Sequence, residues 1–222
     1  MTSPTVLGRF VTPDGQEMVL ELRDGRYTIL VGDAELMSSS AHGSEEVMAQ
    51  RTGELLNAVE SPRILIGGLG MCYTLRAALN CLSPTAVIEV AEVFEEVVEW
   101  CRGPLAHLAG DPLSDPRAKV RLADISTLLQ TENGTYDAIL LDIDNGPTPF
   151  TLASNTRFYS LHGLARLHAR LRPGGILMVW SASPDRPFER RLRRSGFTVE
   201  TETIRADPGT TWPRHTLFLA RT

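Results

Sequence analysis

The chain has 222 residues, of which 42% are hydrophobic and 22% charged, with a formal net charge of −5. This composition is typical of one globular domain with at most a small addition, and the acidic balance disfavours a general nucleic-acid binder. No apolar run is long enough to cross a membrane, and no secretory signal core follows Met1. Cys72, Cys81 and Cys101 lack metal-ligand spacing, so we expect no metal site. An odd number of cysteines suits a reducing compartment, and with the acidic charge and the lack of a long apolar run it predicts a cytoplasmic protein that binds neither nucleic acid nor a membrane.

The first 40 residues predict antiparallel strands. Asp-Gly pairs separate three short apolar segments: residues 10–12, Met18–Leu22 and Tyr27–Val31. Such pairs between apolar stretches are typical of β-hairpins. Ser44, followed by acidic residues 45–46, predicts a helix that starts with a hydroxyl cap and ends near Leu56. We therefore expect an N-terminal β-hairpin extension over residues 1–40 and a Rossmann-like domain over residues 41–222.

After Pro62, apolar strands alternate with helical stretches. The strands are predicted near residues 63–67, 86–91, 118–122, 137–142 and 175–180. The helices are predicted near residues 73–82, 94–108, 125–131, 156–170 and 186–194; the last is rich in arginine, which indicates one solvated face. Strands this apolar on both faces indicate a parallel sheet covered by helices on both sides. Val199–Ile204 and His215–Ala220 add two strands, the last antiparallel, so the expected fold class is α/β with an open, doubly wound, seven-stranded sheet.

A glycine turn follows the first strand of this sheet. Gly68 and Gly70 lie where such sheets bind ligands, outside the carboxyl ends of the strands. Glu92 ends the next strand, and a carboxylate there can accept hydrogen bonds from both hydroxyls of a ribose. Tyr73 occupies the position of the third glycine of dinucleotide sites, which disfavours a nicotinamide oxidoreductase. A cofactor without phosphates, such as S-adenosylmethionine, fits better.

Further acids follow the third and fourth strands. Asp124 is placed either to accept a hydrogen bond from an adenine amino group or to cap the next helix. Asp142 directly follows an apolar strand, where a carboxylate can attract a sulfonium or amine cation or take a proton; backbone amides could instead satisfy it in a structural role. Asp144 is expected on the opposite side if the strand continues that far.

These motifs together resemble the spermidine synthase family of class I methyltransferase-fold proteins, over roughly residues 26–220. The resemblance lies in Ile64–Leu79, Glu92–Arg102, Asp124, Tyr136–Pro147, Phe158–Tyr159 and Leu171–Pro184. It implies a sheet of the class I methyltransferase type and an adenosyl sulfonium cofactor, S-adenosylmethionine or its decarboxylated form. It also implies Glu92 at the ribose, Asp124 at the adenine and Asp142 as the catalytic residue. The expected cofactor site also includes Met71, Val93 and Ile125.

The chain departs from the family around the acceptor. Met71 stands where the glycine loop of the family carries an aspartate, and Asn145 replaces the second aspartate of the strand-four motif. Trp180 replaces a glutamine, Trp212 a tyrosine, and residues 44–46 a tyrosine-histidine-glutamate run. Because a diamine carries two positive charges, loss of two carboxylates should weaken its binding. The expected acceptor-binding residues are Asp144, Asn145, Trp180 and Trp212.

The leading interpretation is a transferase that alkylates an amine-like small molecule with S-adenosylmethionine or its decarboxylated form. Aminopropyl transfer, as in spermidine synthase, is the first expectation, and an ordinary putrescine enzyme is disfavoured. Methyl transfer or other sulfonium chemistry is the alternative. A non-catalytic nucleoside-binding or assembly protein is an alternative of another class. A small-molecule acceptor is the expected partner, and a homodimer is left open.

Overall fold

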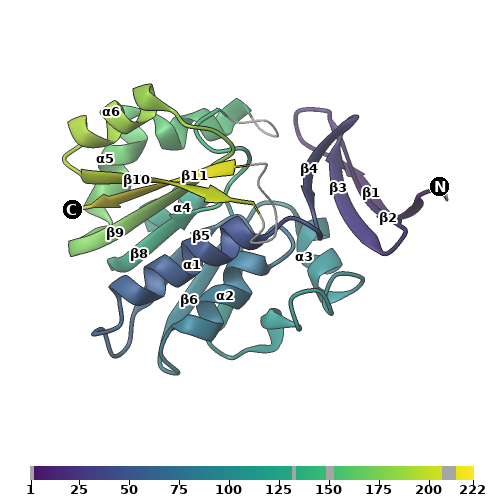
Figure 1. Ribbon diagram of the computed structural model, residues 1–222, viewed down its shortest axis with the longest axis horizontal. Helices are drawn as coiled ribbons and strands as arrows, with labels where there is room; N and C mark the ends of the chain where they lie inside the picture. Colours follow the sequence, from purple (N-terminus) through teal and green to yellow (C-terminus); the bar gives the residue numbers. More distant parts are fainter. Residues whose placement is uncertain (1–2, 132–133, 149–152, 207–213) are drawn as a thin grey trace.

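The computed structural model describes residues 3–131, 134–148, 153–206 and 214–222. The chain forms a four-stranded antiparallel sheet near its N-terminus and a seven-stranded, mostly parallel sheet flanked by helices (Figure 1). This architecture confirms the expected α/β fold class. Among the described helices, none is both long and apolar enough to span a membrane.

The small sheet has one strand more than expected. Its strands follow in the order β1 (Thr5–Val11), β2 (Glu17–Arg23), β3 (Arg26–Val31) and β4 (Ala34–Ser38). The first strand begins five residues before the predicted one. Strand β4 was not predicted, because Glu35 and its neighbours have no pronounced strand preference. Pairing with β3, from Thr28 opposite Ser38 to Val31 opposite Ala34, makes this segment a strand.

The large sheet has the order β10-β11-β9-β8-β5-β6-β7. Its strands are β5 (Arg63–Gly67), β6 (Val87–Glu92), β7 (Ala118–Leu122), β8 (Tyr136–Leu141), β9 (Leu171–Ser181), β10 (Thr198–Arg205) and β11 (Arg214–Arg221). Strand β11 pairs with β9 and β10 in antiparallel fashion, as expected. Strand order reverses between β5 and β8, so a crevice is expected outside the carboxyl ends of these two strands.

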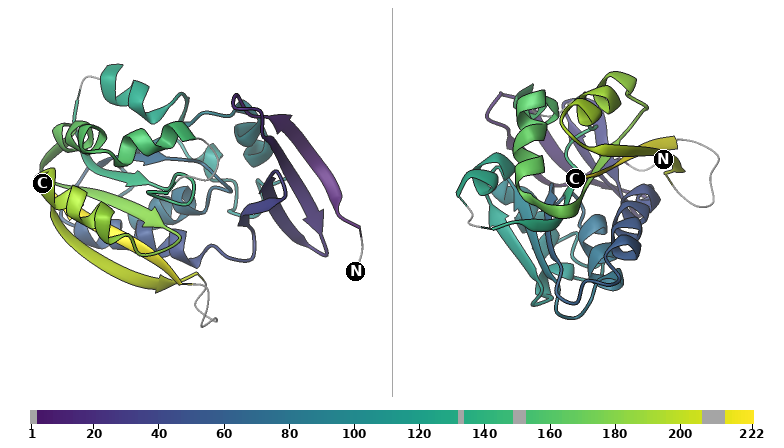
Figure 2. Two further views of the ribbon diagram at one scale, coloured as in Figure 1. Left: turned by 90° about the horizontal axis from the view of Figure 1, so that it is seen from above. Right: turned by 90° about the vertical axis from the view of Figure 1, so that its left-hand side faces the viewer.

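Helices cover both faces of the large sheet (Figure 2). They are α1 (Gly43–Leu55), α2 (Tyr73–Cys81), α3 (Glu95–Arg102), α4 (Ile125–Thr131), α5 (Leu161–Ala169) and α6 (Arg186–Arg194). One hydrophobic core packs against α1, α2 and α3, and a second packs against α4, α5 and α6. On β5, Ile64 and Ile66 belong to the first core and Leu65 to the second. This alternation explains why the parallel strands are apolar on both faces.

Two predicted helices are shorter in the structure. Helix α3 ends at Arg102 rather than near residue 108, because Gly103 leaves the helical backbone conformation, with φ of −110° and ψ of −109°, and Pro104 follows it. The predicted helix over 156–170 is divided into a 3₁₀ helix (Ala153–Tyr159) and α5. Ser160 starts α5 anew, since its hydroxyl accepts a hydrogen bond from the N–H of Gly163 at 3.1 Å.

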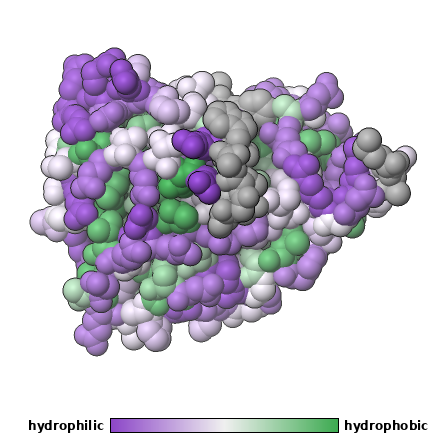
Figure 3. Space-filling view, in the orientation of Figure 1, coloured by the Kyte–Doolittle hydropathy of each residue, from purple (hydrophilic) through white to green (hydrophobic). Residues whose placement is uncertain are grey.

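The arginine-rich helix α6 has the single solvated face that its sequence predicts. Phe188 and Leu192 are fully buried in the second core, whereas the arginines lie on the outside. Figure 3 shows hydrophilic residues gathered at the upper left, where Figure 1 places α6. The arginines of this helix therefore solvate one face of the fold and need no nucleic-acid partner to explain them.

The small sheet packs beside the carboxyl ends of the parallel strands. Met18 and Ile29, from β2 and β3, belong to the same hydrophobic core as Ile64 and Ile66 of β5. Figure 2 shows the small sheet standing across from the large one at that end. The two sheets thus share a core and face each other over the region where strand order reverses.

Gly68 is the tightest point of this region, and we predict that Gly68→Ala destabilises the protein more than Gly15→Ala does. The φ angles of the two glycines are nearly the same, +91° and +86°, so each alanine incurs roughly 1–2 kcal/mol for a left-handed backbone. At Gly68 a Cβ would also lie 2.2 Å from the carbonyl oxygen of Asp142, whereas at Gly15 nothing lies within 4 Å. Overpacking should add about 1–3 kcal/mol. Urea unfolding of both variants measures the difference, and equal losses would refute the close approach.

Candidate functional site

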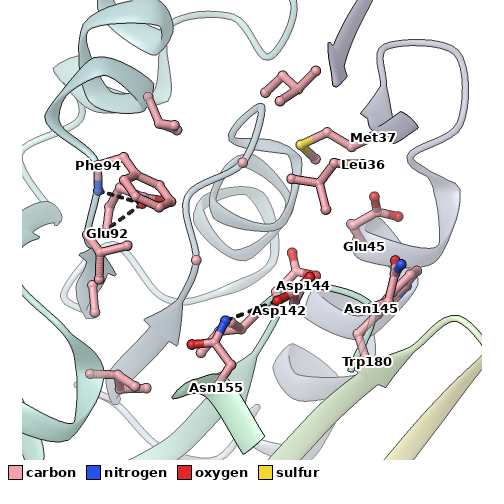
Figure 4. A pocket seen from close by; sticks show the side chains of 18 of the residues that line it. Leu36, Met37, Glu45, Glu92, Phe94, Asp142, Asp144, Asn145, Asn155 and Trp180 are labelled. Atoms are coloured by element: carbon pink, nitrogen blue, oxygen red, sulfur yellow. Dashed lines mark hydrogen bonds between the residues drawn. The ribbon is translucent and has the colours of Figure 1, made fainter. Parts of the chain in front are cut away.

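A cavity of about 340 Å³ lies between the carboxyl ends of β5, β6 and β8 and the small sheet (Figure 4). This volume is within the range typical of small-molecule sites. Strands β2, β3 and β4 supply an apolar part of the wall, formed by Met18, Ile29, Leu36 and Met37. Most of the site residues expected from the sequence also line the cavity: Gly68, Gly70, Glu92, Val93, Asp124, Ile125, Asp142, Asp144, Asn145 and Trp180.

Among the expected site residues that the structure describes, Met71 does not appear in this wall. The side chain of Met71 is 1% exposed and belongs to the first hydrophobic core. The turn that brings Gly68 and Gly70 to the cavity directs the side chain of Met71 into the core, away from the cavity, and a contact between Met71 and a cofactor stays a prediction. Trp212 lies outside the described residues.

The glycine turn is held by the neighbouring strand and by the small sheet. The N–H of Gly68 donates to the carbonyl of Ala91 at 2.9 Å. Gly70 has a left-handed backbone with φ of +51°, and a Cβ there would lie 2.8 Å from the Cε atom of Met37, so the end of this β4 side chain would have to move. The turn therefore joins β5, β6 and the small sheet at one wall of the cavity.

The carboxylate of Glu92 is fixed by backbone amides. One oxygen accepts from Leu69 at 3.0 Å, and the other accepts from Val93 at 2.7 Å and Phe94 at 3.0 Å. Burial raises the pKa of Glu92, and these three hydrogen bonds oppose the rise. Since a carboxylate has about four acceptor positions, about one stays free for a ligand in the cavity.

Asp124 has the helix-capping role that was one of its two expected roles. One of its oxygens accepts from the backbone N–H of Ser126 at 2.7 Å, at the start of α4. Its other oxygen forms an ion pair with Arg157. The sequence did not predict this arginine, which lies 33 residues further along the chain in the 3₁₀ helix. An adenine amino group at Asp124 would have to share the carboxylate with Arg157.

Asp144 lines the cavity, where its expected role as an acceptor-binding residue requires it, because β8 does not continue as far as this residue. Strand β8 ends at Leu141, and the alternation of side chains that would have turned Asp144 away ends with it. Asp144 has a left-handed backbone with φ of 61°. Its carboxylate accepts a hydrogen bond from the amide of Asn155 at 3.1 Å. A tight turn thus places this second aspartate in the same wall as Asp142.

Asp142 is half-buried at the end of β8, where it lines the cavity. The Thr74 hydroxyl donates to its Oδ2 atom at 2.5 Å. Burial raises the pKa of Asp142 to about 6, although the hydrogen bond from Thr74 lowers it. No ion pair is recorded for this carboxylate among the described residues. With a pKa of about 6 it is mostly ionised at neutral pH, and no cation of the described part of the chain pairs with it.

Glu45 is a site residue that the sequence analysis did not place in the cavity. It comes from α1, is only 8% exposed, and lies on the same side of the cavity as Asp142 and Asp144, across from Glu92 (Figure 4). Burial, and next the negative charge of Asp142, raise its pKa to about 8. Local sequence gives no sign that Glu45 turns inward, and the signal that could have found it is the family resemblance, which places residues 44–46 near the acceptor.

Ser44 does not cap α1 as expected. The helix begins at Gly43 with His42 at the N-cap and without a side-chain cap. The Ser44 hydroxyl instead accepts a hydrogen bond from the Trp180 indole at 3.0 Å and contacts both Glu45 and His215. Trp180, which lines the cavity, is therefore held in place by α1.

The site combines an acidic side with apolar surface. Cations are favoured beside Asp142 and Glu45, because two carboxylates close together in a partly dry site attract positive charge. The apolar wall of the small sheet can cover a hydrocarbon chain. The geometry thus suits a small molecule that carries a positive charge on an apolar body.

The sequence of this chain is similar to a family of known proteins. The family model described as the spermine/spermidine synthase domain matches residues 60–189. Polyamine aminopropyltransferase 2 of Pseudomonas aeruginosa is 33% identical over 171 residues, which are 72% of this chain and 46% of that protein. Polyamine aminopropyltransferase 1 of Streptomyces coelicolor is 37% identical over 99 residues, which are 45% of this chain and 16% of that protein. The chain thus spans less than half the length of these relatives.

Solved structures show the same fold. Spermidine synthase from Thermotoga maritima superposes with a TM-score of 0.75 at 16% identity, over 97% of this chain and 72% of that chain. A spermidine synthase in complex with the transition state analogue AdoDATO gives a TM-score of 0.74 at the same identity and coverage. The family match extends over more than half of the sequence. The chain belongs to the spermine/spermidine synthase domain family.

Proposed function

We propose that this protein transfers an aminopropyl group from decarboxylated S-adenosylmethionine to an amine group of a small molecule. The observation that carries the proposal is the pair of acids, Glu45 and Asp142, in a cavity that also contains a glycine turn and Glu92. The names of the relatives, which are polyamine aminopropyltransferases, support the same chemistry.

The residues of the cavity fit an adenosyl group. Glu92 keeps about one acceptor position for a ribose hydroxyl, one fewer than the sequence suggested, because three backbone amides occupy the others. Val93 and Ile125 offer apolar contacts for a base. Asp124 can accept from an adenine amino group if Arg157, which is about half exposed, shares the carboxylate or moves aside.

The acids would act on the acceptor. Glu45 and Asp142 would hold an ammonium group, and Asp142, ionised at neutral pH, would take one of its protons. When bound, the donor supplies a carbon activated by a sulfonium leaving group. The freed amine nitrogen would attack this carbon, so that the N–C bond forms, the C–S bond breaks and the sulfur keeps the electron pair. Positioning of the two reactants should account for most of the rate.

Methyl transfer from S-adenosylmethionine would use the same leaving group, and a nucleoside-binding protein would use only the Glu92 side of the cavity. The relatives favour aminopropyl over methyl transfer. The acidic side favours an enzyme over a nucleoside-binding protein, because an ionised, half-buried carboxylate such as Asp142, which has no ion pair among the described residues, is costly unless a cation joins it.

We predict that the protein forms an aminopropylated amine from the decarboxylated donor, and no methylated amine from S-adenosylmethionine. Mass spectrometry of reactions with a panel of monoamines, diamines and polyamines detects either product. Putrescine should turn over at less than about 1 s⁻¹, below the median of about 10 s⁻¹ for enzymes, because Met71 and Asn145 stand at family carboxylate positions. A methylated product would reverse the choice of donor, and no product with any amine would reject the transferase proposal.

We predict that Asp142→Asn lowers turnover by roughly 10²–10⁴-fold, the usual contribution of a general base. It should also stabilise the ligand-free protein by about 1–3 kcal/mol at pH above about 6. The folded-state pKa of Asp142 is raised from 3.8 to about 6, so stability falls as pH rises between these values, and asparagine avoids that loss. Turnover and urea unfolding on the same preparations measure both effects.

Asp137→Asn is the matched control on the same strand. Asp137 is buried away from the cavity, where it accepts from the backbone of Arg63 at 2.7 Å and from the Arg172 guanidinium at 2.7 Å. Removing its charge should destabilise the protein and leave turnover per folded molecule unchanged. If Asp142→Asn behaves like this control, Asp142 is a structural residue.

We predict that Glu92→Gln weakens binding of 5′-methylthioadenosine by roughly 10- to 100-fold, which corresponds to about 1.5–3 kcal/mol. Glutamine has one acceptor oxygen and an amide that opposes the backbone N–H donors. Calorimetry on the folded variant measures the affinity. The control is Glu89→Gln on the same strand, since Glu89 pairs with Arg63 at 2.8 Å outside the cavity. Equal affinities for the two variants would remove Glu92 from the site.

A further inference from the structure

The hydroxyl of Ser44 has three polar partners. It accepts from the Trp180 Nε1 atom at 3.0 Å, it donates to the Glu45 Oε2 atom at 2.5 Å, and it lies 2.9 Å from the Nδ1 atom of His215. Ser44 itself is 0% exposed. A hydroxyl has one proton to donate and two lone pairs, so these three contacts use its full capacity.

The charge of Glu45 then decides which nitrogen of His215 carries a proton. When Glu45 is ionised it can only accept, so Ser44 must donate to it. The Trp180 indole can only donate. The remaining lone pair of Ser44 must therefore accept from His215, which requires the proton on Nδ1 and leaves Nε2 as an acceptor.

The opposite arrangement follows when Glu45 is protonated. Its carboxyl proton can be donated to the Ser44 oxygen, which still accepts from Trp180. Ser44 then donates its own proton to His215, which requires a bare Nδ1 and places the imidazole proton on Nε2. Each state satisfies all three contacts. The ionised state allows only the Nδ1 tautomer of the neutral ring, and the protonated state allows the Nε2 tautomer when the acid proton lies on Oε2.

We propose that Glu45, Ser44 and His215 form a proton relay through which Glu45 exchanges its proton with water. From the protonated state, Glu45 passes its proton to Ser44, Ser44 passes one to Nδ1 of His215, and Nε2 releases one to water. One proton leaves, Glu45 becomes an anion, and the ring changes tautomer. Reversal of the three transfers takes up one proton. His215 is half-buried, whereas Glu45 is buried, so His215 is the end of the relay that water reaches.

The groups around the relay suit this exchange. Asp142 from β8, Glu46 from α1 and Tyr73 from α2 all interact electrostatically with Glu45, and burial and Asp142 raise its pKa to about 8. Burial lowers the pKa of His215, so the ring stays neutral while Glu45 titrates. Trp180 packs edge-on against the His215 ring, with 4.6 Å between the ring centroids, and keeps this ring beside Ser44.

The role of the relay rests on the proposed function. At neutral pH Glu45 holds a proton, and an acceptor that arrives as an ammonium ion favours its loss. The relay would let this proton leave by Ser44 and His215, at another part of the cavity wall, while the acceptor covers Glu45. Glu45 would then be an anion beside the cation, and Asp142 would be free to take the ammonium proton. His215 and Ser44 are thus positioning residues.

The tautomer of His215 tests the relay without any donor or turnover. Nitrogen NMR of the ligand-free protein, labelled at histidine, should show the proton on Nε2 at about pH 7 and on Nδ1 at about pH 9, on either side of the Glu45 pKa of about 8. In Glu45→Gln the amide can donate to Ser44 as a protonated acid does, so His215 should keep the Nε2 tautomer at both pH values. Loss of its signals in His215→Gln assigns them.

His168 serves as an internal reference, because its ring contacts Phe197 edge-on at 4.9 Å outside the cavity. The tautomer of His168 should be the same in the wild type and in Glu45→Gln at both pH values.

Addition of propylammonium at about pH 7, compared with sodium chloride of equal ionic strength, should shift His215 toward the Nδ1 tautomer in the wild type only. An unchanged His215 tautomer across the pH range, or a switch that persists in Glu45→Gln, overturns the relay. A pH switch without any response to propylammonium overturns its link to cation binding, whether or not aminopropyl transfer is observed.

Discussion

The site depends on how closely three strand ends approach one another where strand order reverses. The N–H of Asp142 donates to the carbonyl of Gly67 at 3.0 Å, and the N–H of Gly68 donates to the carbonyl of Ala91 at 2.9 Å. Only a residue without a Cβ fits between the ends of β5 and β8. These backbone contacts bring Glu92 and Asp142 into the wall of one cavity.

The acids of this protein lie in two kinds of environment, one at each end of the large sheet. Away from the cavity, Glu89 pairs with Arg63 and Asp137 with Arg172. At the cavity, burial raises the pKa values of both Asp142 and Glu45, and the negative charge of Asp142 raises that of Glu45 further. A protein that needed these acids only for stability would pair them in the same way. The raised pKa values therefore mark the cavity as the place where a cation from outside would be favoured.

The small sheet completes the site rather than merely adding to the fold. Met37 of β4 packs against Gly70, and Leu36 stands beside it at the cavity (Figure 4). Met18 and Ile29 belong to both the shared core and the cavity wall. The apolar residues that would contact the body of a substrate are thus fixed by the same packing that joins the two sheets.

The sequence by itself determined the alternation of strands and helices, the glycine turn and the acids that follow β6, β7 and β8. These features are local, because apolar periodicity and turn residues act over a few positions, and the carboxyl ends of parallel strands meet at one edge. Tertiary structure alone decided that Met71 packs in the core, that Asp144 turns into the cavity, and that Arg157 pairs with Asp124. It also brought Ser44 to His215, which is 171 positions away. A partner at that distance leaves no periodic trace in the sequence, since it is selected by the packing of α1 against β9 and β10 rather than by the neighbours of either residue.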